Sequence, residues 1–115
     1  MGLYQYQFRF PDGPPDLDGV LADVRARLGN TRGVDSLYIE ADGLVVATTM
    51  MDPFTHHVLA AALLDRGGQA MNFSGEPVEL AVPQWAHEPV HQMSWRERMS
   101  IRLGWWGWLF GTIRA

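Results

Sequence analysis

The order in which two hydrophobic periodicities follow one another along this chain constrains its fold more than any other sequence feature. Residues 4–10 alternate apolar and polar side chains, which is typical of a strand with one buried face. Residues 17–28 then repeat apolar side chains at the spacing of one helix face. A strand-like and a helical segment follow each other again between residues 44 and 67. This succession predicts an α+β domain in which helices pack on one sheet.

Turn and capping residues place the boundaries of the remaining elements. Residues 41–43 predict a tight hairpin between two strands, and Asp52-Pro53 predicts the start of the second helix. Residues 44–51 are apolar on both faces, as a central strand is. The predicted strands are residues 4–10, 34–40, 44–51, 70–73 and 78–82, and the predicted helices begin at Asp16 and Asp52 and end near Gly29 and Gly67.

The order strand, helix, strand, strand, helix, strand is that of two split βαβ halves, with a possible extra strand at the end. We therefore predict a ferredoxin-like α+β sandwich in residues 1–83. Two prolines and the lack of a clear period predict an extended linker in residues 84–93. Residues 94–115 are predicted to form an appended amphipathic helix.

The composition removes several classes of chemistry from consideration. The 115 residues include no cysteine, which excludes thiol nucleophiles, disulfides and zinc sites built on thiolates. All nine cationic residues are arginine, so a Schiff-base lysine and a Walker lysine are excluded as well. The net charge of −4 disfavours nucleic acid as a partner of the whole domain.

Neither end of the chain predicts insertion into a membrane. The N-terminal residues lack the basic region and the long apolar region of a signal peptide. The uncharged stretch at residues 103–113 is 11 residues long, whereas a helix that spans a bilayer needs about 20. We therefore expect a cytoplasmic protein, and association with a membrane surface stays open.

The C-terminal segment carries the strongest functional signal in the sequence. Ser94 and Glu97 have the spacing of a capping box, which predicts a helix that begins at residue 95. Residues 94–115 carry four arginines and one glutamate, a net charge of +3, whereas residues 1–93 carry five arginines and twelve acidic residues, a net charge of −7. Four of the five tryptophans also lie in this segment, and so large an apolar surface needs a cover. The predicted partner-binding residues are Trp95, Met99, Leu103, Trp105, Trp106, Trp108 and Phe110, with Arg96, Arg98 and Arg102 around them.

Three covers for this helix are open from the sequence: the chain's own sheet, another protein chain, and a membrane surface. A surface rich in tryptophan and arginine is typical of protein interfaces, and the same composition suits the surface of an anionic bilayer. We predict a small non-enzymatic interaction module, without a cofactor, that self-associates or binds a protein partner through this helix. A peripheral membrane protein anchored by the same helix is the first alternative.

The four histidines define a second alternative, a small metal-binding protein or enzyme. Residues 87–91 match the H-E-x-x-H pattern of zinc peptidases, but their central proline is incompatible with a helix that runs through both histidines. His56 and His57 lie in the first turn of the second predicted helix. If the chain brought these two side chains to His87 and His91, the four imidazoles would form a candidate metal site.

Overall fold

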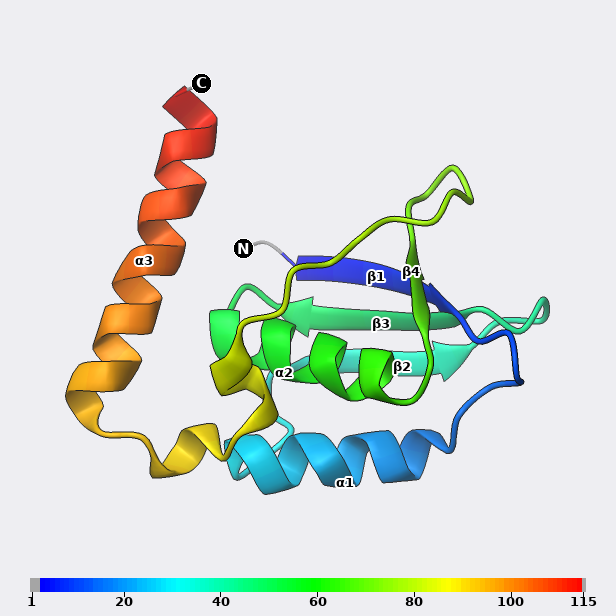
Figure 1. Cartoon of the computed structure of the whole chain (residues 1–115), viewed down its shortest axis with the longest axis horizontal. Helices are drawn as coiled ribbons and strands as arrows, with labels where there is room; N and C mark the ends of the chain where they lie inside the picture. The colour runs from blue at the N-terminus through cyan, green and yellow to red at the C-terminus, as the bar shows by residue number, and fades with distance from the viewer. Residues whose placement is uncertain (1–2, 115) are drawn as a thin grey trace.

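A computed structural model describes the backbone of residues 3–114 and the side chains of residues 3–105. The chain is a mixed α+β protein in which one sheet of antiparallel strands packs against helices (Figure 1). The strands are β1 (Leu3–Arg9), β2 (Val34–Ile39), β3 (Val45–Met50) and β4 (Gln69–Met71). The helices are α1 (Leu17–Leu28), α2 (Pro53–Asp65) and α3 (Trp95–Arg114), with two short 3-10 helices, η1 (Gln84–His87) and η2 (Val90–Gln92).

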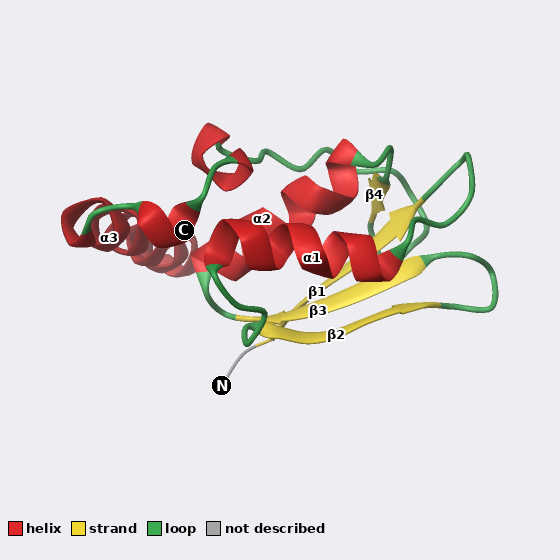
Figure 2. Cartoon of the chain, turned by 90° about the horizontal axis from the view of Figure 1, so that it is seen from below, coloured by secondary structure: helices red, strands yellow, loops and turns green. Residues whose placement is uncertain are grey.

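The sheet has the strand order β2-β3-β1-β4, and every neighbouring pair is antiparallel. Tyr6 of β1 and Leu37 of β2 both lie opposite Ala47 of β3, so β3 is central, as its two apolar faces predicted. At the outer edge, the register of β2 shifts between Val34 and Ser36. Helices α1 and α2 lie on one face of the sheet, and no helix lies on the opposite face in the part of the chain that is described (Figure 2).

The hydrophobic core fills the space between the sheet and the two helices. Phe8 of β1, Val24 of α1 and Leu59 of α2 are each fully buried in it. The helix ends follow local chemistry: the carboxylate of Asp16 accepts a hydrogen bond from the backbone N–H of Asp18 at 3.2 Å, and Gly29 ends α1 with a positive φ of 87°. The periodicity predicted for α1 is confirmed, because Val20 and Val24, which belong to the predicted apolar face, are its buried residues.

The prediction of an extended linker in residues 84–93 is wrong. This segment forms η1 and η2, which begin directly after Pro83 and Pro89 and bury the small side chains of Ala86 and Val90. The guanidinium of Arg27 donates a hydrogen bond to the carbonyl of Ala86 at 3.2 Å and ties η1 to the body of the domain. Helices of three or four residues are too short to show a period, so the sequence pattern missed them.

The strand predicted at residues 78–82 is also absent from the described structure. Beyond β4 the chain makes an isolated bridge between Met71 and Pro77, and the backbone N–H of Val78 donates to the carbonyl of Ala70 at 2.9 Å. Proline has no N–H to donate to a ladder. The side-chain amide of Gln69 lies 3.1 Å from the carbonyls of Ala70 and Val78 and donates to them in place of a ladder.

Gly33, in the turn directly before β2, packs closely against α2. A Cβ atom at this position would overlap the side chain of Thr55, so Gly33→Ala is expected to lower the free energy of unfolding by about 1 to 3 kcal/mol. Gly104→Ala is the matched control, because a Cβ there meets nothing within 4 Å and alanine favours a helix. Urea titration of both variants measures the difference. Equal stability of the two variants would contradict the packing described for Gly33.

Candidate functional site

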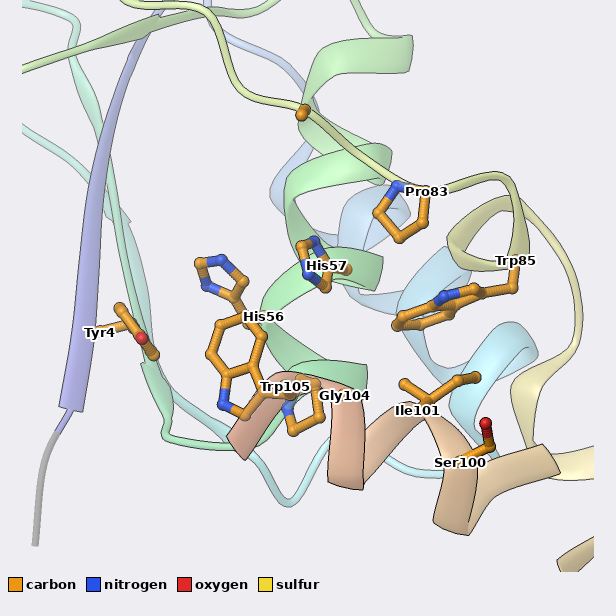
Figure 3. A pocket seen from close by; sticks show the side chains of 11 residues that line it. Tyr4, His56, His57, Pro83, Trp85, Ser100, Ile101, Gly104 and Trp105 are labelled. Carbon is orange, nitrogen blue, oxygen red and sulfur yellow. The ribbon is translucent and has the colours of Figure 1, made fainter. Parts of the chain in front are cut away.

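A pocket of about 710 Å³ lies where the first turn of α2 meets α3. Four parts of the chain build its wall: β1, α2, the segment that ends in η1, and α3 (Figure 3). Its lining is dominated by rings and small apolar groups. The lining residues are Tyr4, Pro53, His56, His57, Ala81, Pro83, Trp85, Ser100, Ile101, Gly104 and Trp105.

Aromatic rings from distant parts of the sequence meet around this pocket. The ring of His56 lies 4.6 Å from that of Tyr4 and 5.1 Å from that of Trp105, measured between centroids. The ring of His57 meets Trp85 at 5.5 Å and Trp105 at 5.4 Å, both edge to face. These are the distances at which aromatic pairs attract one another. Trp105 therefore joins α3 to β1 and α2 through ring contacts.

Local sequence explains why these rings point to the same place. Tyr4 belongs to the inward-facing set of β1, because side chains of a strand alternate between faces. The Asp52-Pro53 pair starts α2 and so places His56 in its first turn, although the Asp52 carboxylate accepts from the Thr55 hydroxyl at 3.2 Å and not from a backbone N–H. The hydroxyl of Tyr6 donates to the carbonyl of His56 at 3.1 Å and fixes that turn against the sheet.

The imidazoles in the pocket are neutral at pH 7. Burial, followed by the neighbouring His57, lowers the pKa of His56 to about 3, and burial lowers the pKa of His57 as well. Burial also raises the pKa of Tyr4, which keeps its phenol protonated. The described lining includes no aspartate, glutamate or arginine, so no formal charge faces the space. Such a wall suits an uncharged molecule.

Helix α3 begins as its capping residues predicted. The hydroxyl of Ser94 accepts from the backbone N–H of Glu97 at 3.2 Å and lies 3.1 Å from the Glu97 carboxylate, to which it donates. The helix stands at one end of the domain, beside the start of α2, and does not cover the open face of the sheet (Figures 1 and 2). Within the described residues, the chain's own sheet is therefore not the cover of α3.

The predicted partner-binding residues of α3 separate into two faces. Trp105 faces the domain together with Ile101, which packs against the core. Trp95, Met99 and Leu103 lie on the opposite face, where they are 71, 37 and 64% exposed. We call these three residues the outer stripe. The side chains of Trp106, Trp108 and Phe110 lie outside the described residues.

The three arginines predicted to bind a partner also differ in their surroundings, because two of them contact the domain and one is exposed. Arg98 donates from two guanidinium nitrogens to the carbonyl of Val90 at 3.3 Å, and the Arg102 guanidinium lies 5.4 Å from the ring centroid of Phe54. Both arginines line a smaller polar pocket of about 310 Å³ next to the domain. Arg96 is exposed near the outer stripe.

The structure does not bring the four histidines together. Nδ1 of His87 lies 3.2 Å from a carboxylate oxygen of Asp65, and Nδ1 of His91 lies 3.2 Å from the carbonyl of Arg27, whereas His56 and His57 line the aromatic pocket. Within the described residues, no group of three or more histidine, aspartate or glutamate side chains is placed to hold a metal ion. The H-E-x-x-H match is divided between η1 and η2, because Pro89 separates them, so it does not form a zinc-peptidase helix.

Comparisons with protein-family models, with curated proteins and with solved structures give no match for this chain. The described part of the chain has no helix with the length and apolar character needed to cross a bilayer. Sequence reasoning missed Tyr4 and Trp85 as site residues. Tyr4 follows the same alternation as the core residues of its strand, and Trp85 lies in the segment interpreted as a linker.

Proposed function

We propose that this protein is a non-enzymatic interaction module that self-associates through the outer stripe of α3. The scaffold in this proposal is a ferredoxin-like sandwich. Its support is the strand order β4-β1-β3-β2, read from the other edge of the sheet, together with the placement of α1 and α2 on one face. The fold itself hosts unrelated functions, so the proposal rests on the surface of α3 and not on the scaffold.

The exposure of the outer stripe is the observation that carries this proposal. Trp95, Met99 and Leu103 are four residues apart, so they form one continuous apolar line along the first half of α3. Tryptophan dominates the binding energy of many interfaces, and Trp95 is among the most exposed large apolar side chains described. The helix is also held by its other face, so binding through the stripe needs no rearrangement of the domain.

A second copy of the chain is the occupant that the charges favour. The segment of residues 94–115 has a net charge of +3 and the preceding residues have a net charge of −7, so each copy offers both members of an attractive pair. In a closed twofold dimer, α3 of each copy then lies against the acidic body of the other copy, and the two contacts are equivalent by symmetry. If another protein chain is the occupant of the stripe, the purified protein is expected to keep a single-chain mass in the experiment below.

Two arginines count against the membrane alternative. A helix on an anionic bilayer directs its arginines to the headgroups. Here Arg98 donates to the carbonyl of Val90, and Arg102 lies over Phe54, so both guanidinium groups contact the chain's own domain. Among the described arginines of α3, this leaves Arg96 to face a headgroup near Trp95, fewer cations than an anionic bilayer surface favours.

Sedimentation velocity over a range of concentrations tests the proposal. The unmodified protein is expected to sediment as a dimer or larger assembly, and Trp95→Glu combined with Leu103→Glu is expected to sediment as a single chain. Phe73→Glu is the matched control, because Phe73 is 73% exposed but belongs to the turn beyond β4, and this variant is expected to keep the assembled mass. A single-chain mass for the unmodified protein, or an unchanged mass for the double variant, would overturn self-association. Binding of the monomeric protein to anionic vesicles would instead favour the membrane surface.

A further inference from the structure

We propose that the pocket between α2 and α3 binds an uncharged, flat aromatic molecule. The proposal concerns the inner side of α3, so it does not depend on self-association through the outer stripe. It rests on the size of the pocket, on the kind of side chains that line it, and on a glycine that keeps one wall open.

The size of the pocket is that of a small-molecule site. Binding pockets for small organic ligands measure about 300 to 1,000 Å³, and this one measures about 710 Å³. It is formed by residues from both ends of the chain, since Tyr4 and Trp105 are in ring contact at 5.5 Å. A site at the meeting point of several elements is typical of such pockets.

The side chains that line the pocket favour a flat ligand and disfavour a charged one. Rings of Tyr4, His57, Trp85 and Trp105 face the space, and flat aromatic molecules stack on rings of this kind or meet them edge to face (Figure 3). A charged ligand would lose its hydration without a charged partner in the wall, which costs binding free energy. The neutral imidazoles and the hydroxyl of Ser100 leave a few polar atoms for hydrogen bonds that orient the ligand.

Gly104 keeps one wall of the pocket open at a cost to the helix. Glycine inside a helix is less favourable than alanine by about 1 kcal/mol. A Cβ at Gly104 would meet nothing within 4 Å, and Gly104 itself lines the pocket one turn after Ser100. At 100° per residue, Gly104 lies about 60° from Ile101 on the helix wheel, and Ser100 lies between Gly104 and Leu103 of the outer stripe. No neighbouring atom therefore requires glycine at this position, and the absence of a side chain leaves the space of the pocket free.

A matched pair of fluorescent probes tests both the site and its selectivity. N-phenyl-1-naphthylamine is an uncharged fused-ring molecule, and 8-anilino-1-naphthalenesulfonate has the same ring system with an added negative charge. Titration of the full-length protein is expected to give saturable binding of the neutral probe, with a quenching of tryptophan emission. The anionic probe is expected to bind at least about tenfold more weakly, which corresponds to about 1.4 kcal/mol. Equal affinity for the two probes, or no saturable binding of the neutral one, would overturn the proposal.

Two sets of variants locate the bound probe. Ser100→Leu combined with Gly104→Leu places two good helix-forming side chains into the pocket, and Ala81→Trp fills it from the opposite wall. Each is expected to lower the affinity for the neutral probe at least about tenfold while far-UV circular dichroism and the melting temperature show a folded protein. Leu103→Glu, on the outer stripe, is the control that leaves the affinity unchanged. Loss of binding in the control, or retention in both filled variants, would place the probe elsewhere and refute the site.

Discussion

Leu59→Ala is expected to lower the free energy of unfolding by about 3 to 4 kcal/mol. Leu59 has no exposed surface and lies on α2 in the core cluster with Phe8 and Val45. The substitution removes buried methyl groups and leaves a cavity that these neighbours fill only in part. Because domains of this size are stable by about 5 to 15 kcal/mol, the loss is a large fraction of the total.

Leu103→Ala is the matched control for this prediction. Leu103 has the same side chain but is 64% exposed on the outer stripe, so its truncation is expected to change the stability of the single chain by less than about 0.5 kcal/mol. Guanidinium titration at a concentration where the protein is monomeric measures both variants. If Leu103→Ala were as destabilising as Leu59→Ala, the outer stripe would have to be part of the chain's own core.

Acidification is expected to destabilise the fold through His56. In the unfolded chain this imidazole takes up a proton near pH 6.5, whereas in the folded protein burial and the neighbouring His57 lower its pKa to about 3. Between these two pH values the unfolded state binds more protons than the folded state. The contribution of His56 to the free energy of unfolding is therefore fully present above pH 6.5 and is lost as the pH falls toward 3. From pH 6.5 to 4.5 the loss amounts to about 2 to 3 kcal/mol.

His56→Phe separates this effect from other titrations. Phenylalanine keeps a ring of similar size between Tyr4 and Trp105 but cannot take up a proton. Thermal unfolding of both proteins in steps from pH 7 to 4.5 is expected to give a much shallower decline for the variant. Some decline remains in the variant, because burial lowers the pKa of His57 as well and that group acts in the same direction. Parallel declines in the two proteins would show that His56 is not the origin of the acid sensitivity.

The larger elements of this fold were predictable because each has a long, regular pattern. The alternation in residues 4–10 placed Tyr6 and Phe8 on the buried face, and the helical spacing from residue 17 placed Val20 and Val24 in the core. These patterns extend over seven or more residues, which is long enough to distinguish a strand from a helix. The order of elements followed from them without any information on tertiary contacts.

The pocket was not predictable, because tertiary contacts create it. The sequence wheel of α3 has apolar side chains on two sides, and nothing local indicates that Ile101 and Trp105, and not Trp95 and Leu103, meet the domain. Trp85 reaches the pocket from a 3-10 helix too short to show a period. The sequence offered His56 and His57 as candidate metal ligands, whereas their ring partners lie about 30 to 50 positions away, toward both ends of the chain.

The two edges of the sheet affect how this protein behaves at high concentration. An edge strand with a long, regular row of free N–H and C=O groups is a template for pairing with another molecule and leads to aggregation. Here one edge strand, β4, has three residues, and the other, β2, is interrupted by a register shift next to Asp35, an arrangement that twists a strand away from a straight partner. Crowded copies of the chain are therefore poorly suited to extend one another's sheets into fibrils.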